Sequence, residues 1–268
     1  MSDNVPILLY HSVSDAPSNE SADYTVTPAD FERHLDAIVE RGLHCMTVSD
    51  YLDARDAGTL PTDKQVALIT FDDGYLDFVE TCLPMLAARK LPSTMYITTG
   101  WMSDTSSRQA GPSDPMMAFK QLADLEDAKV EIGAHSHAHL QMDTLSAKHS
   151  YDELTRSKAL LEDSLGHPIR SFAYPHGYNS HRIRKQVRQA GYDSATAVRN
   201  AFSPIEDNPL RLARLMLMRD TTVADVEQWL DGHLAPVASR FESPKTTGWR
   251  AYRRAKAILS GKPGSAYL

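Results

Sequence analysis

The sequence lacks the features that mark a membrane protein or a disulfide-stabilised secreted protein. Its 268 residues include only two cysteines, Cys45 and Cys82, too few for a disulfide framework. No apolar run approaches the roughly 18 residues that a membrane-spanning helix needs. The N-terminus has neither the basic segment nor the apolar stretch of a secretory signal. We therefore predict a cytoplasmic protein with reduced thiols and no membrane span.

Basic residues are scarce over most of the chain and concentrated at its end. The net charge is −7, yet residues 239–268 carry seven Lys and Arg against one acid, which leaves −13 for the first 238 residues. An acidic body argues against general nucleic-acid binding. The tail contains a basic amphipathic helical pattern at 249–259, typical of a helix that lies on an anionic membrane, here the inner membrane face, or docks on a protein partner. A helix that closes against its own acidic body is the alternative.

Apolar patterning predicts strands that alternate with helices. Strands are expected at 5–10, 66–71, 93–98, 130–133, 171–174, 193–198 and 211–217. About seven strand–helix repeats predict a parallel sheet with helices outside it. At this length a closed or nearly closed β/α barrel is favoured over a doubly wound open sheet. We expect one barrel domain over residues 1–238 and an appended basic tail over 239–268.

One segment, 100–115, interrupts this pattern. It is rich in Ser, Asp, Gly and Pro and begins near Trp101. Loops of this length are usually functional or mobile. An active-site lid and a solvated excursion are both open interpretations.

Two adjacent carboxylates, Asp72 and Asp73, follow the predicted strand 66–71. The C-terminal ends of strands are where β/α barrel enzymes place their active sites. Adjacent like charges repel unless a cation or a proton separates them. The pair therefore suits a metal ion together with a general base, although an acidic cap of the next helix is the simpler alternative.

Three histidines lie within five residues after the predicted strand 130–133. They are His135, His137 and His139, and neutral imidazoles are common ligands for zinc and similar ions. A helical turn would place the first and the third on one face, and we expect His137 to face solvent. One Asp and two His supply three protein ligands and leave a position open for water, as in a catalytic metal site.

These motifs resemble those of the polysaccharide deacetylases of the NodB-homology type, carbohydrate esterase family 4. Residues 70–74 (Thr-Phe-Asp-Asp-Gly) match its first motif and 135–139 (His-Ser-His-Ala-His) its second. Residues 172–177 (Phe-Ala-Tyr-Pro-His-Gly) resemble a variant of its third motif, and 10–13 (Tyr-His-Ser-Val) resemble the start of the bacterial branch. The resemblance covers roughly residues 5–220 and implies a distorted, seven-stranded β/α barrel.

The resemblance also implies roles for individual residues. Asp72 would be the general base, and Asp73, His135 and His139 would hold one divalent metal ion. Zinc is the expected metal, with nickel, cobalt or another divalent ion as alternatives. The backbone N–H of His176 would help the metal to stabilise the tetrahedral oxyanion. The implied substrate is an N-acetylated sugar in a polysaccharide, oligosaccharide or glycoside of exopolysaccharide or cell-envelope biosynthesis, and acetate is the implied product.

The sequence departs from the family pattern at two places. Ala173 occupies the position of the arginine that normally orients the catalytic Asp. Arg214, on the predicted strand 211–217, is our candidate replacement, and an ordinary surface arginine is the alternative. The motif that normally provides a histidine as general acid is not recognisable, so His11 and His176, both near strand ends, are the candidate proton donors.

Residues of the third motif and the long loop are candidates for sugar binding. Tyr174, Tyr178 and Trp101 could stack on the apolar faces of a sugar, although aromatic residues at strand ends usually pack locally. Pro175 and Gly177 would complete the substrate-binding turn.

Two other functions stay open. The same metal site could cleave another C–N bond, such as a ring amide, or the protein could be a non-catalytic sugar-binding scaffold that lacks the later motifs. The paired Asp and His residues argue against the scaffold, because a binding module needs no general base.

Overall fold

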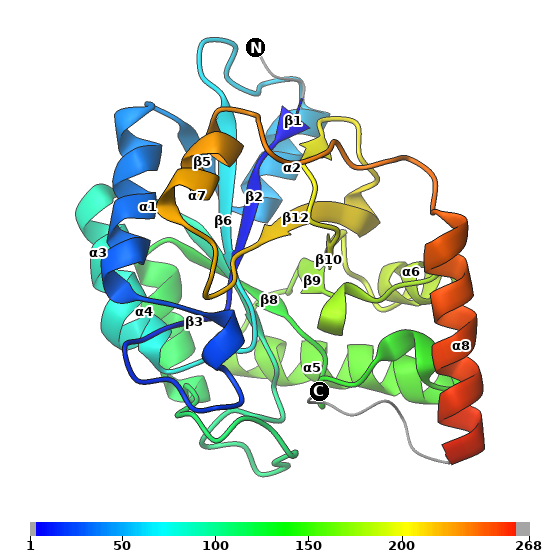
Figure 1. Cartoon of the computed structure of the whole chain (residues 1–268). Coiled ribbons are helices and arrows are strands. Elements are labelled where there is room, and N and C mark those ends of the chain that lie inside the picture. Colours follow the sequence, from blue (N-terminus) through cyan, green and yellow to red (C-terminus); the bar gives the residue numbers. More distant parts are fainter. Residues whose placement is uncertain (1–3, 261–268) are drawn as a thin grey trace.

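Seven parallel strands close into a barrel at the centre of the molecule (Figure 1). The computed structural model describes residues 4–260. In order around the barrel the strands are β2 (Ile7–Tyr10), β12 (Leu212–Met216), β10 (Ser194–Val198), β9 (Ser171–Ala173), β8 (Val130–Ala134), β7 (Ser93–Ile97) and β6 (Val66–Phe71). Pairing of β6 with β2 closes the ring, and β5 (His44–Met46) also pairs with β6. The predicted seven-stranded barrel is confirmed, and the open sheet is wrong.

Helices cover the outside of the barrel, so its strands are buried on both faces. All six residues of β6 are buried, which is why its sequence is almost continuously apolar rather than alternating. The helices are α1 (Pro28–Glu40), α2 (Val48–Asp56), α3 (Leu83–Arg89), α4 (Leu122–Asp127), α5 (Ala147–Leu165), α6 (His181–Gln189), α7 (Val223–Leu230) and α8 (Pro244–Ser260). No helix in the described part of the chain is long and apolar enough to cross a bilayer.

Shorter elements connect the barrel to its helices. Two small sheets pair β1 (Asn4–Val5) with β11 (Ser203–Pro204) and β3 (Ser12–Val13) with β4 (Thr25–Val26). Single turns form η1 (Ala22–Tyr24), η2 (Phe78–Cys82, a π-helical turn), η3 (Phe119–Gln121), η4 (Met142–Thr144), η5 (Pro175–Gly177) and η6 (Pro209–Arg211). Strand β5 and helix α2 were not predicted, because neither has a strong period: β5 has three residues and α2 few apolar ones.

Capping residues explain where the long helices begin and end. Thr27 accepts a hydrogen bond from the N–H of Asp30 at the start of α1, and Ser146 accepts one from His149 at the start of α5. Gly166 ends α5 with φ +79°, a left-handed conformation that glycine adopts without strain. Thr, Ser and Gly are residue types that helices favour at these positions.

The basic tail packs against the acidic body rather than standing apart. Helix α8 runs along one side of the barrel (Figure 1). Arg253 donates to Asp143 of η4 at 2.5 Å, and Arg250 donates to the backbone carbonyl of Asn179 at 2.8 Å. Up to residue 260 the tail is therefore a helix that packs against its own acidic body, the second of the two interpretations given above. Residues 261–268 lie outside the described part.

A buried histidine makes the core sensitive to acid. His34 on α1 is 0% exposed, and its Nδ1 lies 3.2 Å from the hydroxyl of Tyr10. Burial lowers the pKa of His34 from 6.5 to about 4, because the charged imidazolium loses its hydration in the core. The folded protein therefore holds this ring neutral over a pH range in which the unfolded chain protonates it.

The free energy of unfolding should fall as the pH drops from about 6.5 to about 4, because the unfolded state binds the proton of His34 more readily. The shift corresponds to a contribution on the order of 3 kcal/mol. In urea titrations, His34→Gln should lose less stability than the wild type across this range, whereas His233→Gln, at an exposed position, should follow the wild type. Parallel curves for wild type and His34→Gln would contradict this explanation.

Candidate active site

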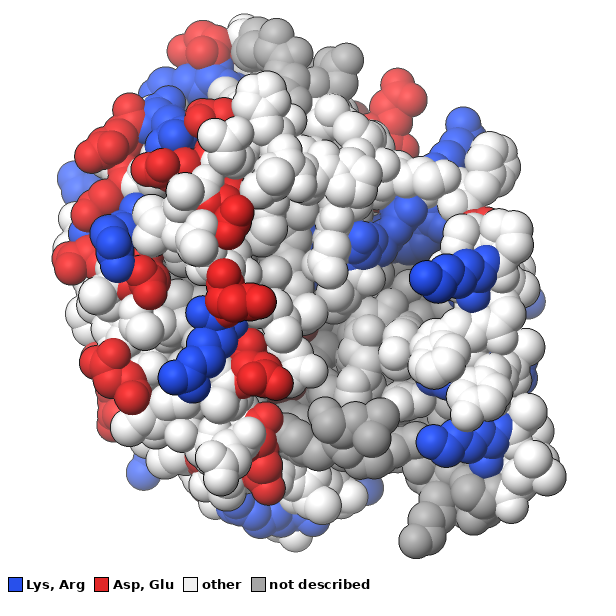
Figure 2. All heavy atoms as spheres, in the orientation of Figure 1, with Lys and Arg blue, Asp and Glu red and all other residues white. Residues whose placement is uncertain are grey.

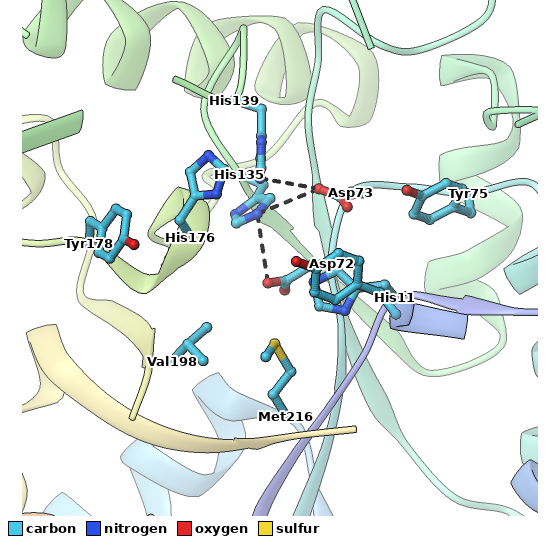
Figure 3. A pocket seen from close by; sticks show the side chains of 11 residues that line it. His11, Asp72, Asp73, Tyr75, His135, His139, His176, Tyr178, Val198 and Met216 are labelled. Carbon is cyan, nitrogen blue, oxygen red and sulfur yellow. Dashed lines mark ion pairs between the residues drawn. The ribbon is translucent and has the colours of Figure 1, made fainter. Parts of the chain in front are cut away.

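The predicted catalytic and metal-binding residues meet at the C-terminal ends of the barrel strands. All of them except Arg214 line a cavity of about 260 Å³, hereafter the active-site cavity (Figure 3). Its lining comprises His11, Tyr24, Asp72, Asp73, Tyr75, His135, His139, His176, Tyr178, Val198 and Met216. Residues separated by up to about two hundred positions along the chain thus face one space.

Three side chains form a cluster with the dimensions of a metal site. Oδ1 of Asp73 lies 3.6 Å from Nε2 of His135 and 3.5 Å from Nε2 of His139, and Figure 3 shows both rings turned toward this carboxylate. The three ligand atoms lie within 4.8 Å of one another. Ligand atoms about 2.1 Å from a tetrahedral ion are about 3.4 Å apart, so the spacing suits such an ion.

The surroundings of these three residues also fit a cation. Oδ1 of Asp73 is buried and has no hydrogen-bond partner among the described residues. Nδ1 of His135 lies 2.8 Å from the carbonyl oxygen of Ala173. A proton on Nδ1 donates to that carbonyl and leaves the lone pair of Nε2 directed into the cluster, the usual support of a metal-binding histidine.

The histidine loop has a different conformation from the one that we expected. Residues 135–139 form no helical turn: Ser136 and His139 have φ of +65° and +53°. The carboxylate of Glu153, on α5, accepts hydrogen bonds from the N–H groups of His137 and Ala138. This side chain satisfies the backbone of the turn, and the turn brings His135 and His139 together.

His137 is buried, so the expectation that it faces solvent is wrong. It is 2% exposed, and its Nδ1 lies 2.9 Å from the hydroxyl of Thr99. Burial lowers the pKa of His137 to about 4. The ring packs behind the loop and does not line the active-site cavity.

Asp72 is held by a buried, bidentate ion pair with Arg214. Nη1 and Nη2 of the guanidinium donate to Oδ1 and Oδ2, each at 2.6 Å, and Nη1 also donates to the hydroxyl of Thr70 at 3.2 Å. The Arg214 side chain is 0% exposed, so the surface-arginine alternative is wrong. The third motif has Ala173 where the family has an arginine. Arg214 of β12 takes the place of that arginine beside Asp72.

The two adjacent carboxylates therefore have different electrostatic environments. Burial raises the pKa of Asp72, but the charge of Arg214, together with His135, overcomes this and brings it to about 2. Burial raises the pKa of Asp73, and the nearby charge of Asp72 adds to the rise. Asp72 is thus a stable carboxylate, while the charge of Asp73 calls for a compensating cation.

Both candidate proton donors reach the active-site cavity. His11 follows β2, and its ring centroid lies 5.3 Å from that of Tyr24; burial lowers its pKa. The ring of His176 lies 4.7 Å from that of His139 and 5.8 Å from that of Tyr178. Burial, followed by the neighbouring His139, lowers the pKa of His176 to about 2. Both rings are therefore neutral at neutral pH.

Two of the predicted sugar platforms are buried. Trp101 is 1% exposed, and its indole N–H donates to the carbonyl of Ala110 at 2.7 Å. Tyr174 is 0% exposed, and its hydroxyl donates to the carbonyl of Leu210. The prediction that Trp101 and Tyr174 stack on sugar is thus corrected: neither ring offers a free face. Tyr178 does line the active-site cavity.

Trp101 instead packs against His139, one of the three candidate metal ligands, on the side away from the active-site cavity. Its ring lies 4.8 Å from that of His139. The loop 100–115 folds back over it, since the N–H of Gln109 donates to the carbonyl of Gly100 at 2.7 Å. In the third motif Pro175 is buried, and Gly177 has φ +71°. A Cβ at Gly177 would lie 2.5 Å from the backbone nitrogen of Val198, so this turn requires glycine.

Four lining residues were not predicted. They are Tyr24, Tyr75, Val198 and Met216. Tyr75 directly follows the first motif, so its position was a usable signal. Val198 and Met216 lie at the ends of the predicted strands 193–198 and 211–217, so their positions were a usable signal too. Tyr24 carries no such signal.

Comparison with known proteins identifies the family that this chain resembles. The family model described as polysaccharide deacetylase matches residues 59–195. The putative polysaccharide deacetylase YxkH of Bacillus subtilis (strain 168) is 24% identical over 188 residues, 70% of this chain and 62% of that protein, so the match spans less than two thirds of that relative. A poly-beta-1,6-N-acetyl-D-glucosamine N-deacetylase of Staphylococcus aureus (strain MRSA252) is 20% identical over 224 residues, 79% of this chain and 74% of that protein. The solved structure of the Streptococcus pyogenes deacetylase PplD in complex with acetate superposes with a TM-score of 0.74 at 21% identity, over 84% of this chain and 97% of that chain.

Removing Arg214 should be far more costly than removing an exposed arginine. Arg214→Met leaves Asp72 as an uncompensated buried charge, and we expect a loss of about 3–5 kcal/mol in the free energy of unfolding. Arg170→Met is the matched control, because Arg170 also pairs with two carboxylates but is 40% exposed; it should cost about 0–1 kcal/mol. Equal losses in denaturant titrations would contradict the assigned role.

The two neighbouring carboxylates should respond differently to zinc. By isothermal titration calorimetry, Asp73→Asn should weaken zinc binding by more than the roughly 10–100-fold that loss of a supporting residue costs, because a direct ligand is removed. Asp72→Asn should retain zinc binding, since Arg214 engages both of its oxygens. An equal loss in the two variants would show that Asp72 is a ligand as well.

Proposed function

Because the chain belongs to the polysaccharide deacetylase family, we propose that it hydrolyses the acetamide of an N-acetylated sugar in a metal-dependent reaction. The observation that carries this proposal is the pairing of two unlike carboxylates in one cavity. Asp73 lies with His135 and His139 in a cluster that fits a divalent ion, and Asp72 is held ionised beside it. Zinc is the metal that the His and Asp ligands favour.

When bound, a divalent ion would polarise the acetyl carbonyl and make the attacking water more acidic. The protein's own residues supply the remaining chemistry. Asp72 takes the proton from the water as it attacks the carbonyl carbon, and Arg214 keeps both carboxylate oxygens in place for this step. The turn at His176 lines the same cavity and supplies the backbone N–H that we assign to the oxyanion.

The leaving amine needs the proton that Asp72 has taken up. His11 and His176 face the cavity from the turns that follow β2 and β9. We assign to one of these neutral imidazoles the transfer of the proton: it accepts the proton from Asp72 and donates it to the leaving nitrogen, which restores the Asp72 carboxylate and the neutral ring. The bond between the acetyl carbon and the sugar nitrogen breaks, and acetate and a free amino sugar are the products. The substrate named for the Staphylococcus aureus relative makes a polymer of N-acetylglucosamine the first substrate to test.

A sugar-binding scaffold explains the cavity less well. Burying Asp72 and Arg214 removes two charges from water, a cost that a purely structural core avoids by using apolar residues. A catalytic site needs an ionised base beside its metal ligands, and the buried pair of Asp72 and Arg214 provides one. Cleavage of a different C–N bond would use the same groups. The released product distinguishes that reaction from deacetylation.

Acetate release in the presence of zinc tests the proposal directly. We expect the wild type to release acetate, and no ammonia, from N-acetylglucosamine tetramers, and to lose this activity when the metal is stripped. Asp72→Asn should lower kcat by about 10²–10⁴-fold while retaining zinc. Asp163→Asn, at an exposed position on α5, is the control and should behave as the wild type.

Three outcomes would contradict the proposed reaction. Full activity in a metal-stripped sample would exclude the metal mechanism. Ammonia release without acetate would point to another C–N bond. Binding of the tetramer with no release of acetate by the zinc-loaded wild type would favour the scaffold. An O-acetylated saccharide run in parallel shows which acetyl linkage is preferred.

A further inference from the structure

A second cavity adjoins the active-site cavity beside helix α8. It measures about 490 Å³ and lies between α8 and the barrel; we refer to it as the α8 groove. Tyr178 and Val198 line both the α8 groove and the active-site cavity. Figure 2 shows a hollow beside α8 with Lys and Arg side chains on both of its sides. A chain that enters the active site along this wall therefore passes the α8 groove.

The α8 groove is strongly basic, although the body of the protein is acidic. Its lining includes five cationic side chains and a single acid, Glu242: the cations are Arg199, Arg211, Lys245, Arg250 and Arg253. Asp143 and Asp207 lie nearby and pair with Arg253 and Arg199. Among the described residues, these three carboxylates leave the cations of the groove in excess.

Several of the cations have unused donors or no acidic partner. Arg211 donates to the backbone carbonyls of Ser239 and Arg240, and its buried Nε has no hydrogen-bond partner among the described residues. Lys245 is exposed and forms no ion pair within the described part of the chain. A guanidinium anchored on neutral carbonyls and a free ammonium retain their attraction for an anion.

Aromatic rings lie among these cations. Trp249 is 52% exposed and Phe241 79% exposed, and both line the α8 groove. The guanidinium of Arg253 lies 3.5 Å from the ring centroid of Tyr178 and links α8 to the wall of the active-site cavity. Exposed rings offer apolar faces to the C–H faces of a sugar, and the cations beside them offer partners for its acidic groups.

We propose that the α8 groove binds carboxylate or phosphate groups on the saccharide chain whose acetamide enters the active-site cavity. The substrate is then an acidic glycan, an assignment that rests on the proposed deacetylase function. A nucleic acid carries the same kind of charge and would meet the same net −13 of the first 238 residues, so charge does not separate the two ligands. The shared wall with the active-site cavity, at Tyr178 and Val198, favours the saccharide.

Binding can be measured without turnover in the full-length protein. The probes are tetragalacturonate, a glycerol phosphate tetramer, and the neutral N-acetylglucosamine tetramer, titrated calorimetrically at low salt. Lys245→Glu should weaken binding of the preferred acidic probe by about threefold to tenfold, and binding of the neutral tetramer much less. A glutamate in the first turn of α8 is compatible with the helix.

The matched control is Lys256→Glu. Lys256 is also exposed on α8 but does not line the groove, so this charge reversal should leave the affinity for the acidic probes within about twofold of the wild type. Binding of tetragalacturonate alone identifies carboxylates as the recognised groups, and binding of the glycerol phosphate tetramer alone identifies phosphates. Failure of both probes to bind, or equal weakening by the two reversals, would overturn the proposal.

Two further results separate this proposal from the deacetylase function. Acetate release from the neutral tetramer, with no binding of either acidic probe, would refute the α8 groove assignment and leave the function intact. Acidic probes that bind in a Lys245-dependent manner, with no acetate released from any saccharide, would refute the function instead. A thymidine tetranucleotide that binds more tightly than both acidic probes would overturn the choice of a saccharide.

Discussion

The buried ion pair between Arg214 and Asp72 is the interaction on which the site depends. Arg214 comes from β12 and Asp72 follows β6, and β2 lies between these two strands only because the barrel closes. In an open sheet with the same strand order, β12 and β6 would lie near opposite edges. Closure thus creates the ion pair. The ion pair keeps Asp72 ionised, and the charge of Asp72 makes the neighbouring Asp73 dependent on a cation.

The metal cluster is supported from behind by groups with no role in the chemistry itself. Glu153 accepts two backbone hydrogen bonds of the histidine loop, and Trp101 packs against His139. The carbonyl of Ala173 orients His135. Such supports hold the three candidate ligands in place, so that a metal would bind without reorganising them. The loop 100–115 belongs to this layer: it buries Trp101 and packs at the back of the ligands.

Charge organises the molecule on a larger scale as well. The acidic body and the basic tail meet at α8, where Arg250 and Arg253 both lie against Asp143, and Arg184 of the body pairs with Glu242 of the tail. These pairs anchor the helix with only part of the tail's positive charge. Lys245 of the tail joins Arg199 and Arg211 of the body in lining the α8 groove next to the active-site cavity. One feature of the charge distribution thus secures the tail and makes a basic surface beside the site.

The sequence by itself determined the strand–helix alternation, the barrel, and which Asp and His residues gather in the candidate site, because these depend on local order and short motifs. Asp72 and Asp73 follow one strand, and His135 and His139 another, so the ends of parallel strands bring them together. The tertiary structure alone decided the partner of Asp72, the burial of Trp101, Tyr174 and His137, and the docking of α8. Each of these depends on which distant surface covers a side chain, and spacing along the chain carries no information about that. The arginine shows the difference most clearly: it is absent from its usual position at Ala173, and closure of the barrel instead places Arg214 beside Asp72, which lies 142 positions earlier in the chain.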